Sequence, residues 1–144
     1  MRIVSWNLNS VRSRHRRLRR LVERHRPDVV LLQETKCVDE VFTSLCSFAS
    51  DAGYAVAHHG RAGTYSWWSY RPGQFEANRG LRIDLVLCSH DLASCIRTVA
   101  IDLAERADDD VDEKPSDHAP VIVDLTDGRS GPGNGSSGTA KGRS

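Results

Sequence analysis

The opening part of the chain changes from a strand-like to a helix-like spacing of apolar residues. Residues 2–8 predict a first strand that ends at Asn7. Residues 11–25 predict a helix that Asn9 or Ser10 can cap, with an apolar stripe formed by Val11, Leu18, Leu21 and Val22. The remaining surface of this helix is largely arginine, so we expect one buried face and one strongly basic face.

Pro27 stops the predicted helix, and the apolar run behind it predicts a buried parallel strand over residues 28–34. Parallel strands joined by a helix end at the same edge of a sheet, where open α/β sheets bind their ligands. We therefore expect Asn7 and Glu34 to present their side-chain oxygen atoms to one rim.

Later segments have weaker patterns. Residues 41–52 predict a short helix, and residues 53–57 predict a third strand. The apolar run 83–87 predicts another strand, which contains Asp84. Because a buried carboxylate needs a hydrogen-bonding partner, we expect Asp84 to pair with a polar side chain from elsewhere.

A turn over residues 114–120 precedes the apolar run 121–123. Its two prolines restrict the backbone, so Asp117 and His118 are expected where a loop enters a strand. A carboxylate can bind a hard cation, and an imidazole titrates near neutral pH. His118 would also satisfy Asp84, although a solvated Asp-His pair in a strand-entry turn is the alternative interpretation.

Composition indicates one domain followed by a tail. The chain has 144 residues and is 39% hydrophobic, which predicts a single domain over residues 1–126. Residues 127–144 contain six glycines and almost nothing apolar, which predicts a disordered Gly/Ser-rich tail. The chain has no long apolar stretch, so we expect a cytoplasmic monomer without a membrane partner. The four cysteines lack metal-ligand spacing and are expected to be reduced thiols.

The net charge of +1 hides an uneven distribution. Residues 1–36 hold ten Arg and Lys against three Asp and Glu, whereas residues 101–127 hold two against ten. The first region could attract phosphates and the second could gather cations. The acidic run 108–110 lacks the ligand spacing of a calcium loop, so a solvated connector is the expected structure.

Residues 65–71 place four aromatic residues and an arginine close together. Aromatic side chains with a neighbouring arginine can stack on bases or wedge between them. Core packing is the alternative, and we expect it for one of the two tryptophans, Trp67 and Trp68.

Five stretches together resemble the exonuclease III family of AP endonucleases, within the endonuclease/exonuclease/phosphatase superfamily. In chain order, these stretches are residues 3–7, residues 27–36, residues 67–71, residues 78–84 and residues 114–120. The resemblance implies a four-layer α/β sandwich, here truncated. It also implies hydrolysis of phosphodiesters at abasic sites and 3′ ends of double-stranded DNA, with Mg²⁺ or Mn²⁺ as cofactor.

The resemblance also assigns residues to roles. It places Asn7, Glu34 and Asp117 at the metal and phosphate site, and His118 at the scissile phosphate with Asp84 holding its ring. It further implies contact with DNA by Trp67, Trp68, Arg71 and Arg79.

The chain differs from the family between the third predicted strand and the paired tryptophans. The family's central segment, with its Asp-x-Asn motif and catalytic tyrosine, has no counterpart here, and the expected junction lies near residues 60–64. The aspartate of that motif activates the attacking water, so we expect hydrolysis by the shortened chain to be absent or very slow. A DNA-binding protein without hydrolytic activity and a non-functional deletion product are the two alternatives.

Overall fold

The computed structural model describes residues 1–57, 63–107 and 114–126. The strands are β1 (Ile3–Asn7), β2 (Val29–Gln33), β3 (Tyr54–Ala57), β4 (Leu85–Ser89), β5 (Ile96–Ile101) and β6 (Val121–Leu125). The helices are α1 (His15–His25), α2 (Asp39–Leu45), α3 (Ser47–Asp51) and α4 (His90–Ala93), with short 3-10 turns η1 (Val11–Ser13) and η2 (Ala104–Arg106). The predicted α/β class is confirmed.

The larger sheet has the strand order β1-β2-β4-β3. β1 and β2 are parallel, with Ile3 opposite Val29 and Asn7 opposite Gln33. β4 runs antiparallel to both β2 and β3. The parallel pair therefore delivers Asn7 and Glu34, which directly follows β2, to the same edge of the sheet, as the strand-helix-strand pattern predicts.

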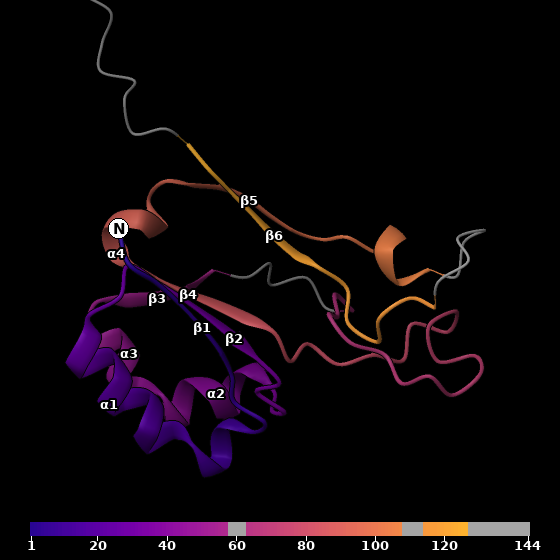
Figure 1. Cartoon of the computed structure of the whole chain (residues 1–144), viewed down its shortest axis with the longest axis horizontal. Helices are drawn as coiled ribbons and strands as arrows, with labels where there is room; N and C mark the ends of the chain where they lie inside the picture. Colours follow the sequence, from indigo (N-terminus) through magenta and orange to yellow (C-terminus); the bar gives the residue numbers. More distant parts are fainter. Residues whose placement is uncertain (58–62, 108–113, 127–144) are drawn as a thin grey trace, which may run out of the picture.

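Helices α1, α2 and α3 cover one face of this sheet (Figure 1). The core between them is made of buried side chains from these helices, the strands, η1 and the residues next to them: Leu8, Val11, Leu18, Val22, Val30, Leu32, Phe42, Cys46, Ala49, Tyr54, Leu85 and Leu87. The predicted apolar stripe of the first helix is confirmed, since three of its four residues are buried and Leu21 packs against them.

The predicted cap of this helix is wrong. Asn9 and Ser10 have φ values of 43° and 88°, outside the extended region that an N-cap residue adopts. The chain instead forms the η1 turn, and α1 begins at His15 after Arg14. The predicted helix over 41–52 is likewise divided at Cys46 into α2 and α3.

The opposite face of the sheet is covered by the antiparallel pair β5-β6 (Figure 1). Val99, Val121 and Val123 pack there against Val86 and Cys88 of β4. Strand alternation places Ile122 on the outer face of this pair, where it is 42% exposed. The described residues thus form three layers, helices, sheet and sheet, in agreement with a truncated four-layer sandwich.

Three predictions fall wholly or mostly on other parts of the chain. The disordered tail, 127–144, lies outside the described residues, and so does most of the junction at 60–64. The acidic run 108–110 lies outside them as well. Within the described ranges, none of the helices has the length and apolar character needed to cross a membrane.

Candidate active site

Four segments meet at the carboxyl edge of the parallel strands. They are the ends of β1 and β2, the residues before β4, and the loop before β6, and they contribute the polar side chains of Asn7, Glu34, Asp84, Asp117 and His118. These side chains line a cavity of about 530 Å³ that continues inward between the two sheets over Leu31, Val86 and Val121. The structure therefore brings the five predicted catalytic and metal-site residues together.

Glu34 is held in place by its neighbours. The Asn7 side-chain amide donates to Glu34 Oε1 at 2.5 Å, and Lys36 Nζ lies 2.8 Å from Glu34 Oε2. The hydrogen bond from Lys36, followed by that from Asn7, lowers the pKa of Glu34 below its usual value. Lys36 Nζ also donates to Asn9 Oδ1 at 2.6 Å, so one ammonium group ties both loops together.

The backbone around Glu34 is strained. Glu34 and Lys36 have φ values of 55° and 51°, and Asn9 and Ser10 on the facing loop are also left-handed. Such conformations are costly for residues other than glycine and gather at functional sites. The loops are held by backbone bonds from Ser10 N to Glu34 O, 2.7 Å, and from Val11 N to Thr35 O, 2.9 Å.

His118 and Asp84 form the expected pair. His118 Nδ1 donates to Asp84 Oδ2 at 2.7 Å, and Asp84 Oδ1 accepts from the Glu34 backbone N at 3.3 Å. Asp84 lies just before β4 rather than inside it as predicted, and the preceding Ile83 O accepts a hydrogen bond from Thr35 N at 2.8 Å. The carboxylate is thereby placed at the sheet edge, and Ser66 Oγ accepts the Asp84 backbone N–H at 3.2 Å.

Asp117 contacts the aromatic segment. Trp67 Nε1 donates to Asp117 Oδ2 at 2.9 Å, and Trp68 N donates to Asp117 O at 3.0 Å. The Tyr70 hydroxyl donates to Pro115 O at 2.9 Å, and Lys114 Nζ lies 3.7 Å from the centre of the Tyr70 ring. The segment 67–70 therefore positions the loop that carries Asp117 and His118.

The two tryptophans differ in position. Trp67 lines the larger cavity described below, whereas Trp68 is 1% exposed and packs edge-on against Phe75. The expectation of core packing for one tryptophan is confirmed, and Trp68, which the resemblance also places against DNA, lines neither cavity. The close approach of Gly80 explains the burial, since a Cβ there would lie 2.6 Å from Trp68 Nε1 and 2.7 Å from Trp67 O.

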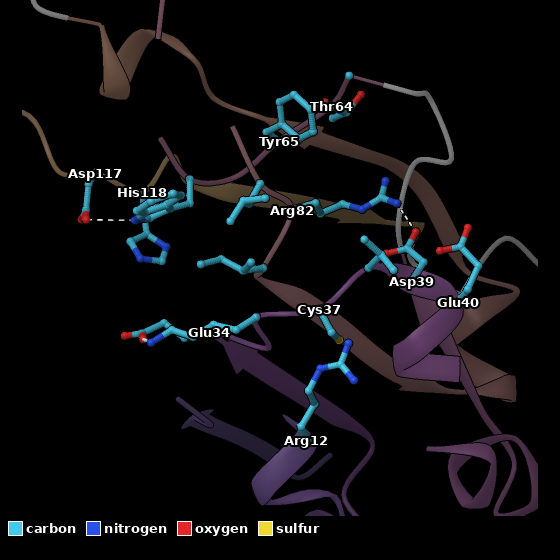
Figure 2. Close-up of a pocket in the computed structure, with 16 residues that line it drawn as sticks. Arg12, Glu34, Cys37, Asp39, Glu40, Thr64, Tyr65, Arg82, Asp117 and His118 are labelled. Atoms are coloured by element: carbon cyan, nitrogen blue, oxygen red, sulfur yellow. Dashed lines mark hydrogen bonds and ion pairs between the residues drawn. The ribbon is translucent and has the colours of Figure 1, made fainter. Parts of the chain in front are cut away.

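A larger cavity of about 1070 Å³ adjoins the first and shares Glu34, Asp117 and His118 with it (Figure 2). Its apolar wall includes Trp67, Leu81 and Ile83. Its polar wall includes Arg12, Lys36 and the ion pair of Arg82 with Asp39. The predicted DNA contacts Arg71 and Arg79 are exposed but do not line either cavity.

Sequence reasoning missed several residues of this site. Lys36, Asn9, Ser66 and Tyr70 make the contacts that fix the predicted residues. Lys36 had one available signal, since it follows the strand that delivers Glu34 by only three residues. The contacts of Ser66 and Tyr70 depend on segments distant in sequence and leave no local pattern.

Two of the three predicted metal ligands, Glu34 and Asp117, have side chains that suit a hard cation. Glu34 and Asp117 supply carboxylate oxygens, the ligands that Mg²⁺ prefers, and two carboxylates with water are a usual set for this ion. Asn7 Oδ1 already accepts from Asn9 N at 2.9 Å, so Asn7 orients Glu34 through its amide group. Within residues 1–57, 63–107 and 114–126, no three His, Cys, Asp or Glu side chains cluster as metal ligands.

Comparison with known proteins finds similarity to exodeoxyribonucleases in part of the chain. Residues 4–63 match the Endonuclease/Exonuclease/phosphatase family. The chain is 40% identical over 65 residues to exodeoxyribonuclease III of Haemophilus influenzae, covering 45% of this chain and 24% of that protein. It is 41% identical over 59 residues to an exodeoxyribonuclease of Bacillus subtilis, covering 41% of this chain and 20% of the relative. The matched part spans about a quarter or less of these relatives.

A solved structure extends the likeness beyond the matched segment. The 3′-5′ exonuclease NExo from Neisseria meningitidis superposes with a TM-score of 0.60 and 24% identity, covering 84% of this chain and 60% of that chain. At this identity the likeness establishes the fold and leaves the chemistry to the site itself. The first part of the chain is therefore similar in sequence to the Endonuclease/Exonuclease/phosphatase family over residues 4–63, and the chain has a fold like that of the 3′-5′ exonuclease NExo.

Proposed function

We propose that Asn7, Glu34, Asp84, Asp117 and His118 form the metal and phosphate part of the active site of a DNA phosphodiesterase. The reaction is that of an exodeoxyribonuclease III-like enzyme, which removes nucleotides from 3′ ends and cleaves at abasic sites during base excision repair in the cytoplasm. The observation that carries this proposal is the Asp84-His118 pair, held at 2.7 Å beside Glu34 and Asp117 in one cavity.

The protein's own groups have distinct tasks in this proposal. With Nδ1–H donated to Asp84, the other ring nitrogen of His118 can, when it also carries a proton, donate a hydrogen bond to an oxygen of the scissile phosphate. Asn7 and Lys36 keep Glu34 ionised and fixed in direction. Glu34 and Asp117 would hold a divalent ion, Mg²⁺ or Mn²⁺, which when bound neutralises charge on the phosphate.

Activation of the attacking water is the step without an assigned residue, because no Asp-x-Asn motif follows the third strand. The loss of a well-placed general base costs about 10²–10⁴-fold in rate. We therefore expect cleavage by this chain to be slower than that of full-length relatives by about this factor. Insertion of the central segment of a relative between Gly60 and Thr64 should restore the rate.

The test is cleavage of a duplex carrying one abasic-site analogue, with Mg²⁺ or Mn²⁺ and resolved on a denaturing gel. His118→Ala should lower the residual or restored rate by about 10²-fold or more. The control His90→Ala removes an exposed histidine of α4 outside the site and should leave the rate unchanged. Equal rates for His118→Ala and the unmodified chain would contradict the proposal.

A DNA-binding protein without hydrolysis is the second candidate. It is favoured by the engagement of the carboxylates within the protein, since both Glu34 oxygens and Asp117 Oδ2 already have partners. Salt-sensitive DNA binding that is indifferent to EDTA, with no cleavage even after insertion of the central segment, would support this second function.

A further inference from the structure

The outer surface of α1 carries a row of arginines that the proposed active site does not use. Arg16, Arg17, Arg20 and Arg24 are all exposed. At 3.6 residues per turn they fall within about 100° of the helix circumference, roughly opposite the buried Leu18 and Val22. From Arg16 to Arg24 the row extends about 12 Å along the helix axis.

The charge of this row is not neutralised by the described part of the chain. Glu23 is the acidic residue within α1, and it is paired with Arg19 at 2.7 Å beside the row. Arg16, Arg17, Arg20 and Arg24 form no ion pair with any other residue in the described ranges. Four like charges on neighbouring turns repel one another, so the row is suited to an anionic partner.

The row lies away from the two cavities. Helix α1 covers the face of the larger sheet opposite β5-β6, and none of its residues lines either cavity (Figure 1). Arg12, just before α1, lines the larger cavity, where its guanidinium group lies beside Cys37 (Figure 2). Arg12 therefore belongs to the larger cavity, and the row of arginines on α1 is a separate surface.

The chemistry of the row favours a phosphate backbone over a lipid surface. Guanidinium groups bind phosphate oxygens in bidentate fashion, and successive turns of α1 present them about 6 Å apart. A helix that lies in a membrane interface needs an exposed apolar face, whereas the apolar side chains of α1 are buried in the core. We propose that the outer face of α1 is a second, non-catalytic surface that binds double-stranded nucleic acid by its phosphates.

The test is fluorescence anisotropy with a labelled, undamaged 20-base-pair duplex and the full chain in EDTA, over a range of salt concentrations. EDTA separates this surface from the proposed catalysis, so the failure of one does not affect the other. Each phosphate contact contributes a slope of about −0.9 to the dependence of log K on log salt. Three contacts therefore weaken binding about 40-fold between 50 and 200 mM salt.

The triple variant Arg16→Gln, Arg20→Gln and Arg24→Gln should lose about 3 units of this slope. Glutamine has nearly the same helix propensity as arginine, and circular dichroism checks that the fold is retained. As matched single changes, Arg20→Gln should reduce the slope by about 1, whereas Arg97→Gln on β5 should not change it. Unchanged affinity and slope in the triple variant would overturn the proposal, and so would binding to anionic phospholipid vesicles without binding to the duplex.

Discussion

The two faces of the larger sheet are packed to different degrees. On the helix side, twelve buried residues form one continuous core that joins α1, α2, α3 and the strands. On the side of β5-β6, three residues are buried, Ala57, Val86 and Cys88, and the others that pack there are only partly buried. Since stability follows buried apolar area, the helix side should carry most of the stability of the fold.

The active site spans this division. The helix side contributes Asn7, Glu34 and Lys36, and the later segments contribute Asp84 and the loop with Asp117 and His118. Asn7, Glu34 and Asp84 therefore lie at the ends of strands of the well-packed unit, whereas the loop with Asp117 and His118 belongs to the less well-packed side and is joined to Asp84 by the His118 hydrogen bond of 2.7 Å. We therefore expect the geometry around Glu34 to be retained when the packing of the loop with Asp117 and His118 is weakened.

The largest expected effect separates the two cores directly. Leu18→Ala removes a fully buried side chain from α1 and should lower the free energy of unfolding by about 2–5 kcal/mol. Leu92→Ala removes the same atoms from a partly buried position of α4, packed against the β3 and β4 residues on the other face of the sheet, and it should cost less than about half as much. Urea unfolding measures both, and equal losses would show that the two sides are equally important.

The thiol of Cys46, which is buried in the core on the helix side of the sheet, offers a second test of this comparison. Burial raises the pKa of Cys46 to about 12, above the value of about 9 in the unfolded chain. Between these pH values the unfolded state has lost a proton that the folded state keeps, so stability must fall as pH rises. The expected slope is about 1 kcal/mol per pH unit above pH 9.

Cys46→Ala provides the control for this slope. The variant lacks the thiol and should show a flatter dependence of unfolding free energy on pH from 9 to 11, measured by urea unfolding. A slope unchanged by the substitution would mean that another group is responsible and that Cys46 does not report on the core.

The smallest expected effect concerns the pKa of Glu34 in the active site. Lys36→Met removes the main cause of the lowered pKa of Glu34, so that pKa should move back up toward its usual value. Lys114→Met makes the same change next to Tyr70, in the loop before β6, and should leave the Glu34 pKa unchanged. Carbon-detected NMR titration of the Glu34 carboxyl measures the pKa in both variants. A shift of equal size in the two would show that the pKa of Glu34 is not set by its own neighbours.

Much of the site could be predicted because its signals are local or topological. The parallel strands place Asn7 and Glu34 at one edge, and the need of Asp84 for a partner indicates His118. The cap of α1 could not be predicted, because the bonds that hold Ser10 in a left-handed conformation come from Glu34, distant in sequence. Likewise, which tryptophan is buried depends on contacts of Trp68 with Phe75 and Gly80.

The contact between Gly80 and the tryptophans also constrains how the sequence can vary. Any side chain at position 80 would need the space that Trp68 Nε1 and Trp67 O occupy. Trp67 O in turn accepts a hydrogen bond from Leu81 N at 2.8 Å, so the backbone there has little room to move. Position 80 is thus restricted to glycine, because a smaller residue at position 68 would remove the contact with the Trp68 ring but not the contact with the Trp67 carbonyl oxygen.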